Sequence, residues 1–336
     1  MEFIDNIKAK LRELNAPPVL RISMMGARGV GKTSVLTSIF KEGQEAIAGS
    51  KIFWKADNNT AGKLNTLKLS LMNAFDTRNP SNLPASSEKS EYCFKVGMSG
   101  KEKVDIRIKD FPGEYLTSSK EEDRESVSGF IEESQVILIA IDTPYLMEES
   151  GSYNEQKNQV QVVSRFLKEN PALFRDKLIM LVPLKCEYYF HNDTIHLVTD
   201  RVVQTYAHLM EYFKENNIAC VVTPIQTLGD IDYSGMKDNP YGGALAKIAC
   251  YEFRGENPKY TPLYCAQPFY YLLTYSINYF EWKNHHPAGS LLEKIWARFI
   301  HDDNAFYYEA LKLNRYILDD GRVFRTLTRN DIIKIN

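Results

Sequence analysis

The chain has 336 residues, of which 44% are hydrophobic, and this length suits one enlarged domain or one domain with an appendage. Its formal net charge of −2 and its sequence pI near 6.3 argue against a broad nucleic-acid surface, because clustered Lys and Arg bind a phosphate backbone. No run approaches the roughly 18 apolar residues of a membrane span, and the first residues do not lead from a cationic to an apolar stretch. We expect a cytoplasmic protein that binds no DNA or RNA and does not span a membrane.

The chain begins with apolar residues at helical spacing. Phe3, Ile7, Leu11 and Leu14 lie on one face of such a helix, which stops before two prolines. The sequence therefore predicts an N-terminal helix over residues 1–17. Packing on the domain is favoured over a membrane-surface role, because acidic residues interrupt the basic face of this helix.

An apolar strand expected over residues 19–25 runs into a glycine-rich loop with the spacing G-x-x-x-x-G-K-[ST]. Glycines let such a backbone curl until consecutive N–H groups point at an anion. Lys32 would then lie on the β and γ phosphates of a nucleotide, and Thr33 would bind Mg²⁺. The helix expected over residues 33–41 points its positive end at the same charge. The predicted nucleotide-binding residues of this loop are Gly26, Gly29, Val30, Gly31, Lys32, Thr33 and Ser34.

A long insert follows, over residues 42–89. Leu64, Leu67, Leu71 and Phe75 support one helix inside it, before a stretch rich in Asn and Pro ends the pattern. Segments of this length inside a compact domain tend to be functional or mobile.

Two segments of alternating polarity, residues 91–96 and 103–109, predict a β-hairpin. The second segment runs directly into Asp110 and reaches Gly113 three residues later, which gives the spacing D-x-x-G. An Asp at this strand end can hold Mg²⁺ through water, and the Gly N–H can bond the γ-phosphate. We therefore assign Asp110 to the metal site with Thr33, and Gly113 to the phosphate site. A simple helix-entry turn is the alternative.

Strands and helices then alternate. The continuous apolar run at residues 135–142 is typical of a strand buried on both faces of a parallel sheet, and a structural role is favoured for its last residue, Asp142. Further strands and helices are expected at residues 177–182, 218–223, 156–169 and 197–215. This order predicts an α/β fold with a doubly wound, mostly parallel six-stranded sheet that includes one antiparallel hairpin strand.

The pattern loosens in a second insert over residues 230–262, which holds a loop at residues 233–243 and a possible hairpin at residues 246–253. An apolar stripe at residues 268–282 predicts the last helix of the nucleotide-binding domain. The aromatic-rich residues beyond it predict a helical C-terminal extension. The expected parts of the chain are the N-terminal helix, a domain over residues 18–285 and an extension over residues 286–336.

From Pro18 to Leu228 the phosphate loop, the insert, the hairpin and the D-x-x-G motif follow one another as they do in the Ras-like P-loop GTPase superfamily, which the chain resembles. Within that superfamily, the Asp-x-Pro-Gly-Glu form at residues 110–114 and the large C-terminal part are similar to bacterial GTPase-like proteins of conflict and defence loci, including the double-GTPase-type families. The resemblance implies a P-loop fold that binds GTP or GDP with Mg²⁺. Because the sequence has one phosphate loop, it resembles a single GTPase unit.

Base recognition departs from the pattern of that superfamily. GTPases carry Asn-Lys-x-Asp after the fifth strand, where this chain has Leu-Lys-Cys-Glu at residues 184–187. The resemblance implies that the Lys185 stem covers the base and that the Glu187 carboxylate accepts from guanine, whereas Leu184 loses the amide. A solvated Lys and Glu in a loop is the alternative. Thr-Pro-Ile at residues 223–225 replaces the Ser-Ala-Lys of many relatives, which is a second departure at the base.

The hydrolytic residues depart as well. Arg28 stands where Ras-like proteins often have Gly, and Glu114 follows the D-x-x-G glycine where many have a Gln that orients water. Our hypothesis is that Arg28 supplies charge in cis and Glu114 orients water across the γ-phosphate, together with Lys32. The alternative has Arg28 pointing to solvent and hydrolysis nearly absent. The candidates for the switch-one Mg²⁺ ligand are Thr60, Thr66, Thr77, Ser86, Ser87 and Ser90.

The leading interpretation is a Mg²⁺-dependent GTP-binding protein, a molecular switch with slow GTP hydrolysis that acts on a protein partner. An ATP-using P-loop enzyme is a second interpretation, and a nucleotide-stabilised scaffold without turnover is a third. Whether the chain is an enzyme stays open, and the enzyme class expected is a GTPase. The expected partners are a guanine nucleotide and a protein effector, and a homo- or hetero-oligomer is compatible with the sequence.

Overall fold

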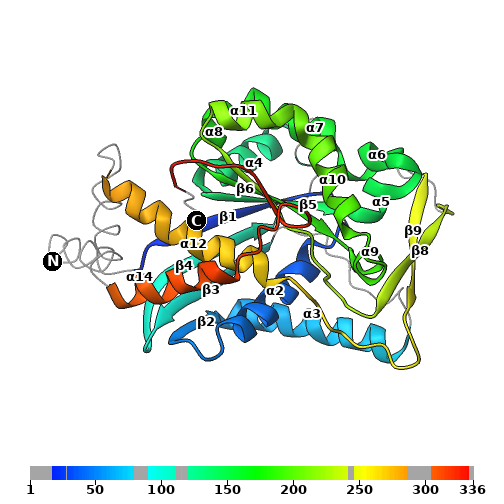
Figure 1. The fold of residues 1–336 in the computed structure, drawn as a ribbon, viewed down its shortest axis with the longest axis horizontal. Coiled ribbons are helices and arrows are strands. Elements are labelled where there is room, and N and C mark those ends of the chain that lie inside the picture. Colours follow the sequence, from blue (N-terminus) through cyan, green and yellow to red (C-terminus); the bar gives the residue numbers. More distant parts are fainter. Residues whose placement is uncertain are drawn as a thin grey trace.

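The computed structural model of this chain describes residues 17–27, 29–78, 90–110, 115, 120–240, 246–285 and 304–332. The helix predicted at the N-terminus lies outside these ranges. At the centre of the described part is an eight-stranded sheet with the strand order β10-β7-β6-β5-β1-β4-β3-β2 (Figure 1). Its strands are β1 (Val19–Met25), β2 (Ile52–Ala56), β3 (Ser90–Met98), β4 (Lys101–Asp110), β5 (Val136–Asp142), β6 (Leu178–Leu184), β7 (Ala219–Val222) and β10 (Arg325–Thr328).

The middle of this sheet is parallel. Strand β1 pairs in parallel with β4 on one side and with β5 on the other, and β5, β6 and β7 continue in parallel. The edges are antiparallel, with β2 on β3, β3 on β4, and β10 on β7. The α/β fold with a mostly parallel sheet, predicted from the alternation of strands and helices, is confirmed.

The predicted strand count of six was wrong, because one more strand pairs at each edge. Strand β2 lies in the insert, where the sequence predicted one helix, and β10 lies in the extension, which was predicted to be helical. Both strands are short and pair with a neighbour on one side, so neither needs the continuous apolar run that marks a central strand. The extension does contain helix α14 (Asn304–Leu311), which is followed by the 3₁₀ turn η5 (Lys312–Tyr316).

Helices cover both faces of the sheet. One face carries α2 (Lys32–Ala46), α12 (Ala266–His285) and α14. The other carries α4 (Glu121–Glu133), α7 (Val160–Glu169), α10 (Ile195–Tyr206) and α11 (Met210–Glu215). Every residue of β5 is buried, and its side chains alternate between the two faces, which explains the continuous apolar run in the sequence.

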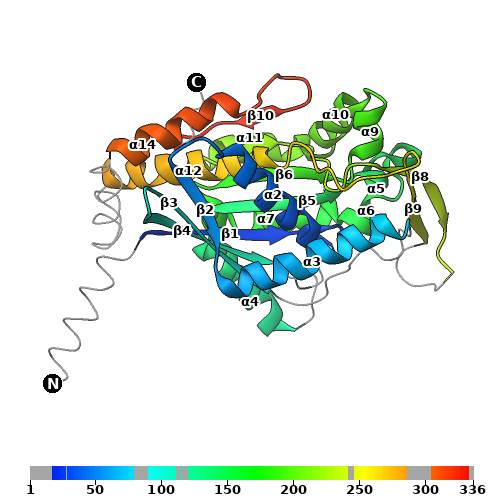
Figure 2. The same cartoon turned by 90° about the horizontal axis from the view of Figure 1, so that it is seen from below.

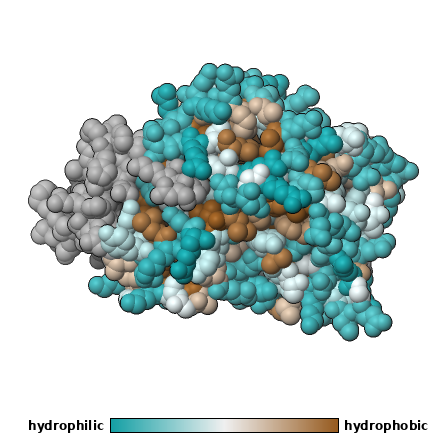
Figure 3. All heavy atoms as spheres, viewed as in Figure 1, coloured by the Kyte–Doolittle hydropathy of each residue, from teal (hydrophilic) through white to brown (hydrophobic). Residues whose placement is uncertain are grey.

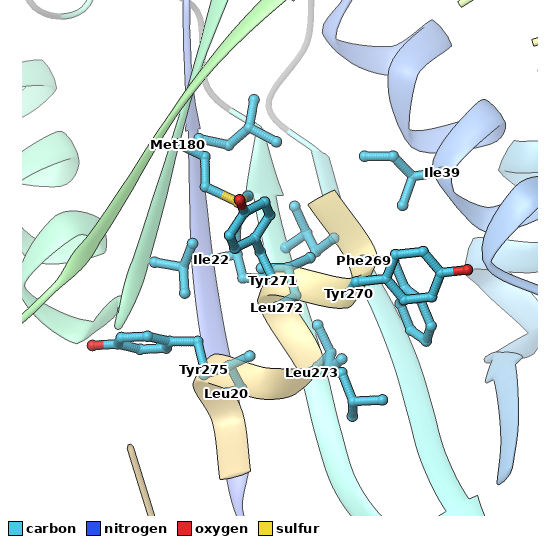
Figure 4. Close-up of a cluster of buried hydrophobic side chains, with 14 of the residues drawn as sticks. Leu20, Ile22, Ile39, Met180, Phe269, Tyr270, Tyr271, Leu272, Leu273 and Tyr275 are labelled. Atoms are coloured by element: carbon cyan, nitrogen blue, oxygen red, sulfur yellow. The ribbon is translucent and has the colours of Figure 1, made fainter. Parts of the chain in front are cut away.

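Helix α12 provides much of the core on its face of the sheet. Its aromatic residues Phe269, Tyr271 and Tyr275 are almost fully buried, together with Leu20 and Ile22 of β1 (Figure 4). Buried aromatic side chains remove large apolar areas from water, so they stabilise a fold strongly. The helix predicted from the apolar stripe is therefore confirmed as a core element.

The two inserts meet at one side of the molecule. The insert after α2 contains α3 (Asn58–Asp76), the helix that the sequence predicted, and Figure 2 shows α3 running along the outside toward a separate hairpin of β8 (Ile231–Asp238) and β9 (Lys247–Phe253). Phe75 of α3 packs on Phe253 with ring centroids 4.8 Å apart. The hairpin expected within residues 246–253 instead pairs that segment with residues that were predicted to be a loop.

Short elements fill the connections. They are α5 (Thr143–Met147), η3 (Glu148–Gly151), α6 (Asn154–Asn158), α8 (Pro171–Phe174), α9 (Glu187–His191) and η4 (Ala207–Leu209). The face seen in Figure 3 is mostly hydrophilic, with apolar residues gathered in a band across its middle. None of the helices in the described ranges is long and apolar enough to cross a bilayer.

The contact between α2 and β2 leads to a first prediction. A Cβ added at Gly43 would lie 2.0 Å from Cζ3 of Trp54, whose ring stacks on Phe269 with centroids 4.1 Å apart. We expect Gly43→Ala to lower the free energy of unfolding by about 1–3 kcal/mol, because the ring cannot move without disturbing this stack. Urea denaturation measures the change. Gly62→Ala on α3 is the matched control, since nothing lies within 4 Å of its Cβ position, and it should stabilise by about 0.5–1 kcal/mol. Equal effects of both substitutions would contradict the proposed clash.

A second prediction concerns the carboxyl of Glu42, which accepts a hydrogen bond of 2.8 Å from the backbone N of Ala266 at the start of α12. Burial raises the pKa of Glu42 from 4.5 to about 7, although this hydrogen bond lowers it. The folded state therefore holds a proton that the unfolded state loses as the pH rises from 4.5 to about 7, so this group makes the protein less stable over that window. We expect Glu42→Gln to come close to the wild type at pH 4 and to be more stable at pH 8, by on the order of 1–3 kcal/mol.

Chemical denaturation at the two pH values measures this difference. The control is Glu211→Gln on α11, because Glu211 is exposed and should contribute little at either pH. A stability difference between Glu42→Gln and the wild type that does not change with pH would refute the effect of burial on this carboxyl.

Candidate functional site

The candidate site lies where four parallel strands end. Strands β1, β4, β5 and β6 run in the same direction, so their carboxyl ends meet at one edge of the sheet. Strand β1 lies between β4 and β5, which makes this edge the point where the strand order reverses. Helices α5, α6 and α9 and the hairpin β8–β9 lie at the same end of the molecule in Figures 1 and 2. Ligands of open parallel sheets bind at such an edge.

The loop between β1 and α2 has the backbone of an anion cradle. Gly26, Gly29 and Gly31 have φ angles of 145°, 72° and 108°, in the region that favours glycine. A Cβ at Gly26 would lie 2.9 Å from the carbonyl oxygen of Ala140 in β5, so the loop passes the neighbouring strand too closely for a side chain. Gly31 is the N-cap of α2, and no side chain of the described residues caps this helix end. Its N–H groups are therefore directed into the loop.

The side chains predicted for the loop occupy distinct positions. Val30 is fully buried, and Thr33 and Ser34 lie in the first turn of α2. Lys32 donates from Nζ to the carbonyl oxygens of Gly26 at 2.7 Å and of Ala27 at 3.3 Å. The lysine thus curls over the loop, with its charge where an anion would bind.

Asp110 faces this lysine from the end of β4. Its Oδ1 lies 3.7 Å from Lys32 Nζ, and both side chains are buried. Burial raises the pKa of Asp110 from 3.8 to about 6, and the nearby charge of Lys32 opposes that rise. Within the described ranges, Asp110 Oδ1 makes no hydrogen bond. This buried carboxylate oxygen, next to the hydroxyl-bearing first turn of α2, fits a hard cation such as Mg²⁺.

Tyr92 of β3 joins this group, and the sequence did not single it out. Its hydroxyl lies near the side chains of Thr33 and Ser90. Burial raises the pKa of Tyr92, the charge of Asp110 raises it further, and hydrogen bonding with those two side chains lowers it. Ser90 lies opposite Asp110 in the β3–β4 register, so a switch-one candidate and both predicted metal ligands share one corner of the site.

Lys185 approaches the loop from the other side. Its Nζ donates to Asp142 Oδ2 at 2.6 Å and to the carbonyl oxygen of Gly29 at 3.3 Å. Its φ of 61° lies in the left-handed region, which is uncommon for a lysine and is often found at functional sites. Asp142 is fully buried, so this ion pair fixes the lysine at the end of β5. The sequence predicted a structural role for Asp142, and its side chain has such a role in this ion pair with Lys185.

Glu187 points into the protein. It is 3% exposed, and its Oε1 accepts from the backbone N of Leu228 at 2.8 Å and from the Thr227 hydroxyl at 3.4 Å. Burial raises the pKa of this carboxyl, and these hydrogen bonds oppose the rise. The solvated loop position considered as an alternative is therefore wrong for Glu187, because its carboxyl is enclosed between α9 and the segment after β7.

Three predicted residues, Arg28, Gly113 and Glu114, lie outside the described residues, as do Ser86 and Ser87. The three threonines of the insert form hydrogen bonds with nearby backbone groups. The Thr60 hydroxyl accepts from the backbone N of Cys93, and the hydroxyls of Thr66 and Thr77 donate to carbonyl oxygens four residues earlier in α3, those of Gly62 and Asn73. Among the described residues no three His, Cys, Asp or Glu side chains are grouped so that they could hold a metal ion.

Strand β1, the loop of left-handed glycines and helix α2 follow one another at the point where the strand order of the parallel sheet reverses. This arrangement defines a P-loop nucleotide-binding protein. The family model described as Double-GTPase 2 matches residues 20–221, more than half of the 336 residues. The chain belongs to the Double-GTPase 2 family.

Solved structures show more distant likeness. Two structures of the Ski7 GTPase-like domain from S. cerevisiae, one bound to GDP and inorganic phosphate and one bound to GTP, are each 14% identical to this chain with a TM-score of 0.34. The matches cover 66% and 67% of this chain, and 45% and 46% of the Ski7 chains, so this chain spans less than half of their length. A comparison with curated proteins gave no match.

The enclosure of Glu187 leads to a third prediction. Glu187→Ala should lower the free energy of unfolding by on the order of 1–3 kcal/mol, because the buried N–H of Leu228 loses its acceptor. Glu187→Gln should stay close to the wild type, since its amide oxygen can accept the same hydrogen bond. Chemical denaturation measures both, with Glu211→Ala at an exposed position of α11 as control. Wild-type stability of Glu187→Ala combined with weakened GTP binding would instead assign this carboxyl to the base.

Proposed function

We propose that this protein is a Mg²⁺-dependent GTP-binding protein that acts as a molecular switch, with slow GTP hydrolysis, on a protein partner. The observation that carries the proposal is the loop of three left-handed glycines, which lies between the Lys32–Asp110 pair and the Lys185–Asp142 pair. Backbone N–H groups, a helix N-terminus and two ammonium groups converge there, as a polyphosphate requires. Membership of the Double-GTPase 2 family supports guanine as the base.

Mg²⁺ fits the corner formed by Thr33 and Asp110. Hydroxyl and carboxylate oxygens are its preferred ligands, and a Mg²⁺ ion usually completes its shell with water and phosphate oxygens. When bound, the ion would neutralise charge on the β and γ phosphates. The role of this chain is to hold Lys32 and Asp110 in place, so that phosphates and cation meet between them.

The residues that would select guanine, at positions 184–187, depart from the GTPase pattern. Lys185 supports it, since its stem passes along the loop with Cε 4.0 Å from the Cβ position of Gly31. Glu187 supports it less, because its Oε1 accepts from the Leu228 backbone. That hydrogen bond keeps an ATP-using P-loop enzyme as the second candidate.

The switch role concerns the segment after Asp110. We propose that the D-x-x-G segment, through Gly113, responds to the γ-phosphate, and that Arg28 and Glu114 act in hydrolysis as the sequence suggests. We propose that the partner binds where α3 packs on the hairpin β8–β9, next to the site. A scaffold without turnover would use the same surfaces, so turnover separates these two functions.

The fourth prediction tests the nucleotide directly. Labelled GTP should bind in the presence of Mg²⁺, and excess unlabelled GTP should displace it at least about tenfold more effectively than ATP does. Lys32→Ala should weaken the binding of GTP by about 100-fold, because a buried charge-assisted contact to phosphate is lost. Fluorescence competition gives the affinities. Lys68→Ala, at an exposed position of α3, is the matched control and should bind like the wild type.

Two outcomes would contradict this proposal. Equal displacement by ATP would favour the ATP-using enzyme, and unchanged binding by Lys32→Ala would remove the phosphate loop from the site. Thermal unfolding of Lys32→Ala accompanies the assay, since the substitution leaves Asp110 buried without its cation. Multiple turnovers of GTP would exclude the scaffold.

A further inference from the structure

A third lysine reaches the phosphate loop from a segment far away in the sequence. Lys157 lies in α6, and its Nζ is 3.5 Å from the position that a Cβ would take at Gly29. The side chain of Lys157 is 8% exposed, whereas Gly29 at the tip of the loop is exposed. A buried ammonium group therefore ends beside an exposed residue of the anion cradle.

The backbone of α6 is held at the end of β5. The Asn158 side chain accepts from the backbone N of Asp142 at 2.8 Å and donates to the carbonyl oxygen of Asp142 at 3.1 Å. Asn158 also donates to Asn154 Oδ1 at 2.8 Å, which closes the turn that carries Lys157. Because the side chain of Asp142 holds Lys185, one residue positions two lysines beside Gly29.

The direction of Lys157 follows from a break in the chain. The sequence predicted one helix over residues 156–169, but Gln159 has a φ of 51° and separates α6 from α7. This left-handed residue lets α6 turn toward the loop while α7 packs on the sheet. The ring of Tyr145 lies beside the lysine, with its centroid 5.5 Å from Nζ, and the Tyr145 hydroxyl donates to the carbonyl oxygen of Lys247 in the hairpin.

We propose that Lys157 binds the phosphates of the nucleotide, as a third cation beside Lys32 and Lys185. The ligand class is a nucleoside di- or triphosphate, and the inference rests on the proposed function of the loop. Lys32 and Lys185 are each paired with an aspartate, so a third ammonium group beside the glycine loop adds to the positive field that attracts a polyphosphate. Tyr145 and Asn158 are positioning residues, because they act through Lys157.

The fifth prediction uses Lys157→Met, which keeps the length and apolar stem of the side chain. GTP and GDP should each bind about 10- to 100-fold more weakly to this variant, while guanosine, which has no phosphates, should bind as it does to the wild type. Lys157→Arg should restore most of the affinity, because it keeps the charge. Lys168→Met on the neighbouring helix α7 is the matched control, since Lys168 is exposed and should bind like the wild type. Calorimetric titration with each of the three ligands gives the affinities.

The outcomes separate this inference from the proposed function. GTP binding that depends on Lys32 but is unchanged in Lys157→Met would overturn the role of Lys157 and leave the phosphate loop intact. A wild type that binds neither GTP nor ATP would overturn both. Equal weakening of guanosine and GTP would also refute a phosphate contact, because it would show a general distortion of the site.

A measurement on the wild type covers the case in which Lys157→Met does not fold. Acetylation of lysines by a small reagent, mapped by mass spectrometry, should be slower at Lys157 in the presence of GTP or pyrophosphate and unchanged by guanosine. The same rate at Lys157 with and without pyrophosphate would overturn the proposal.

Discussion

The site depends on the close approach between the phosphate loop and strand β5. At Gly26 the loop passes the carbonyl oxygen of Ala140 at a distance that leaves no space for a Cβ. This approach places the start of α2 and the curled loop directly above the ends of the parallel strands. At these strand ends Asp110 pairs with Lys32, and Asp142 pairs with Lys185, so both ammonium groups are held beside the loop.

The two ion pairs, one of them buried and the other with Lys185 partly exposed, act mainly on geometry. Removing charges from water costs free energy that the attraction between them only partly offsets, so such pairs contribute little net stability. Their effect is to fix each ammonium group where it faces the loop. Asp110 pairs with the lysine of the loop itself, and Asp142 pairs with Lys185 and also anchors α6 through Asn158. The ends of β4 and β5 thus define the distribution of positive charge before a ligand arrives, which is the pre-organisation that tight binding needs.

Two of the parts added to the central sheet, the insert after α2 and the hairpin β8–β9, contact one another near the site. The insert supplies β2 and α3, and the C-terminal extension supplies β10 at the opposite edge. Leu71 and Phe75 of α3 pack with Leu228 and Ile231, next to the segment whose backbone bonds Glu187. A contiguous set of packed residues therefore connects the insert, the hairpin and the predicted base-binding segment.

The features that the sequence determined by itself are local. The spacing of the glycine loop, the apolar run of β5 and the position of Asp110 at a strand end depend on neighbouring residues, and the fold class followed from their order. The edge strands β2 and β10 were not predicted, because their pairing partners lie far away in the sequence. Glu187 and Lys157 show the same limit at the site. Glu187 meets the backbone of Leu228, and Lys157 lies beside Gly29. Packing between distant segments decides these contacts, and the spacing of residues in the sequence does not predict them.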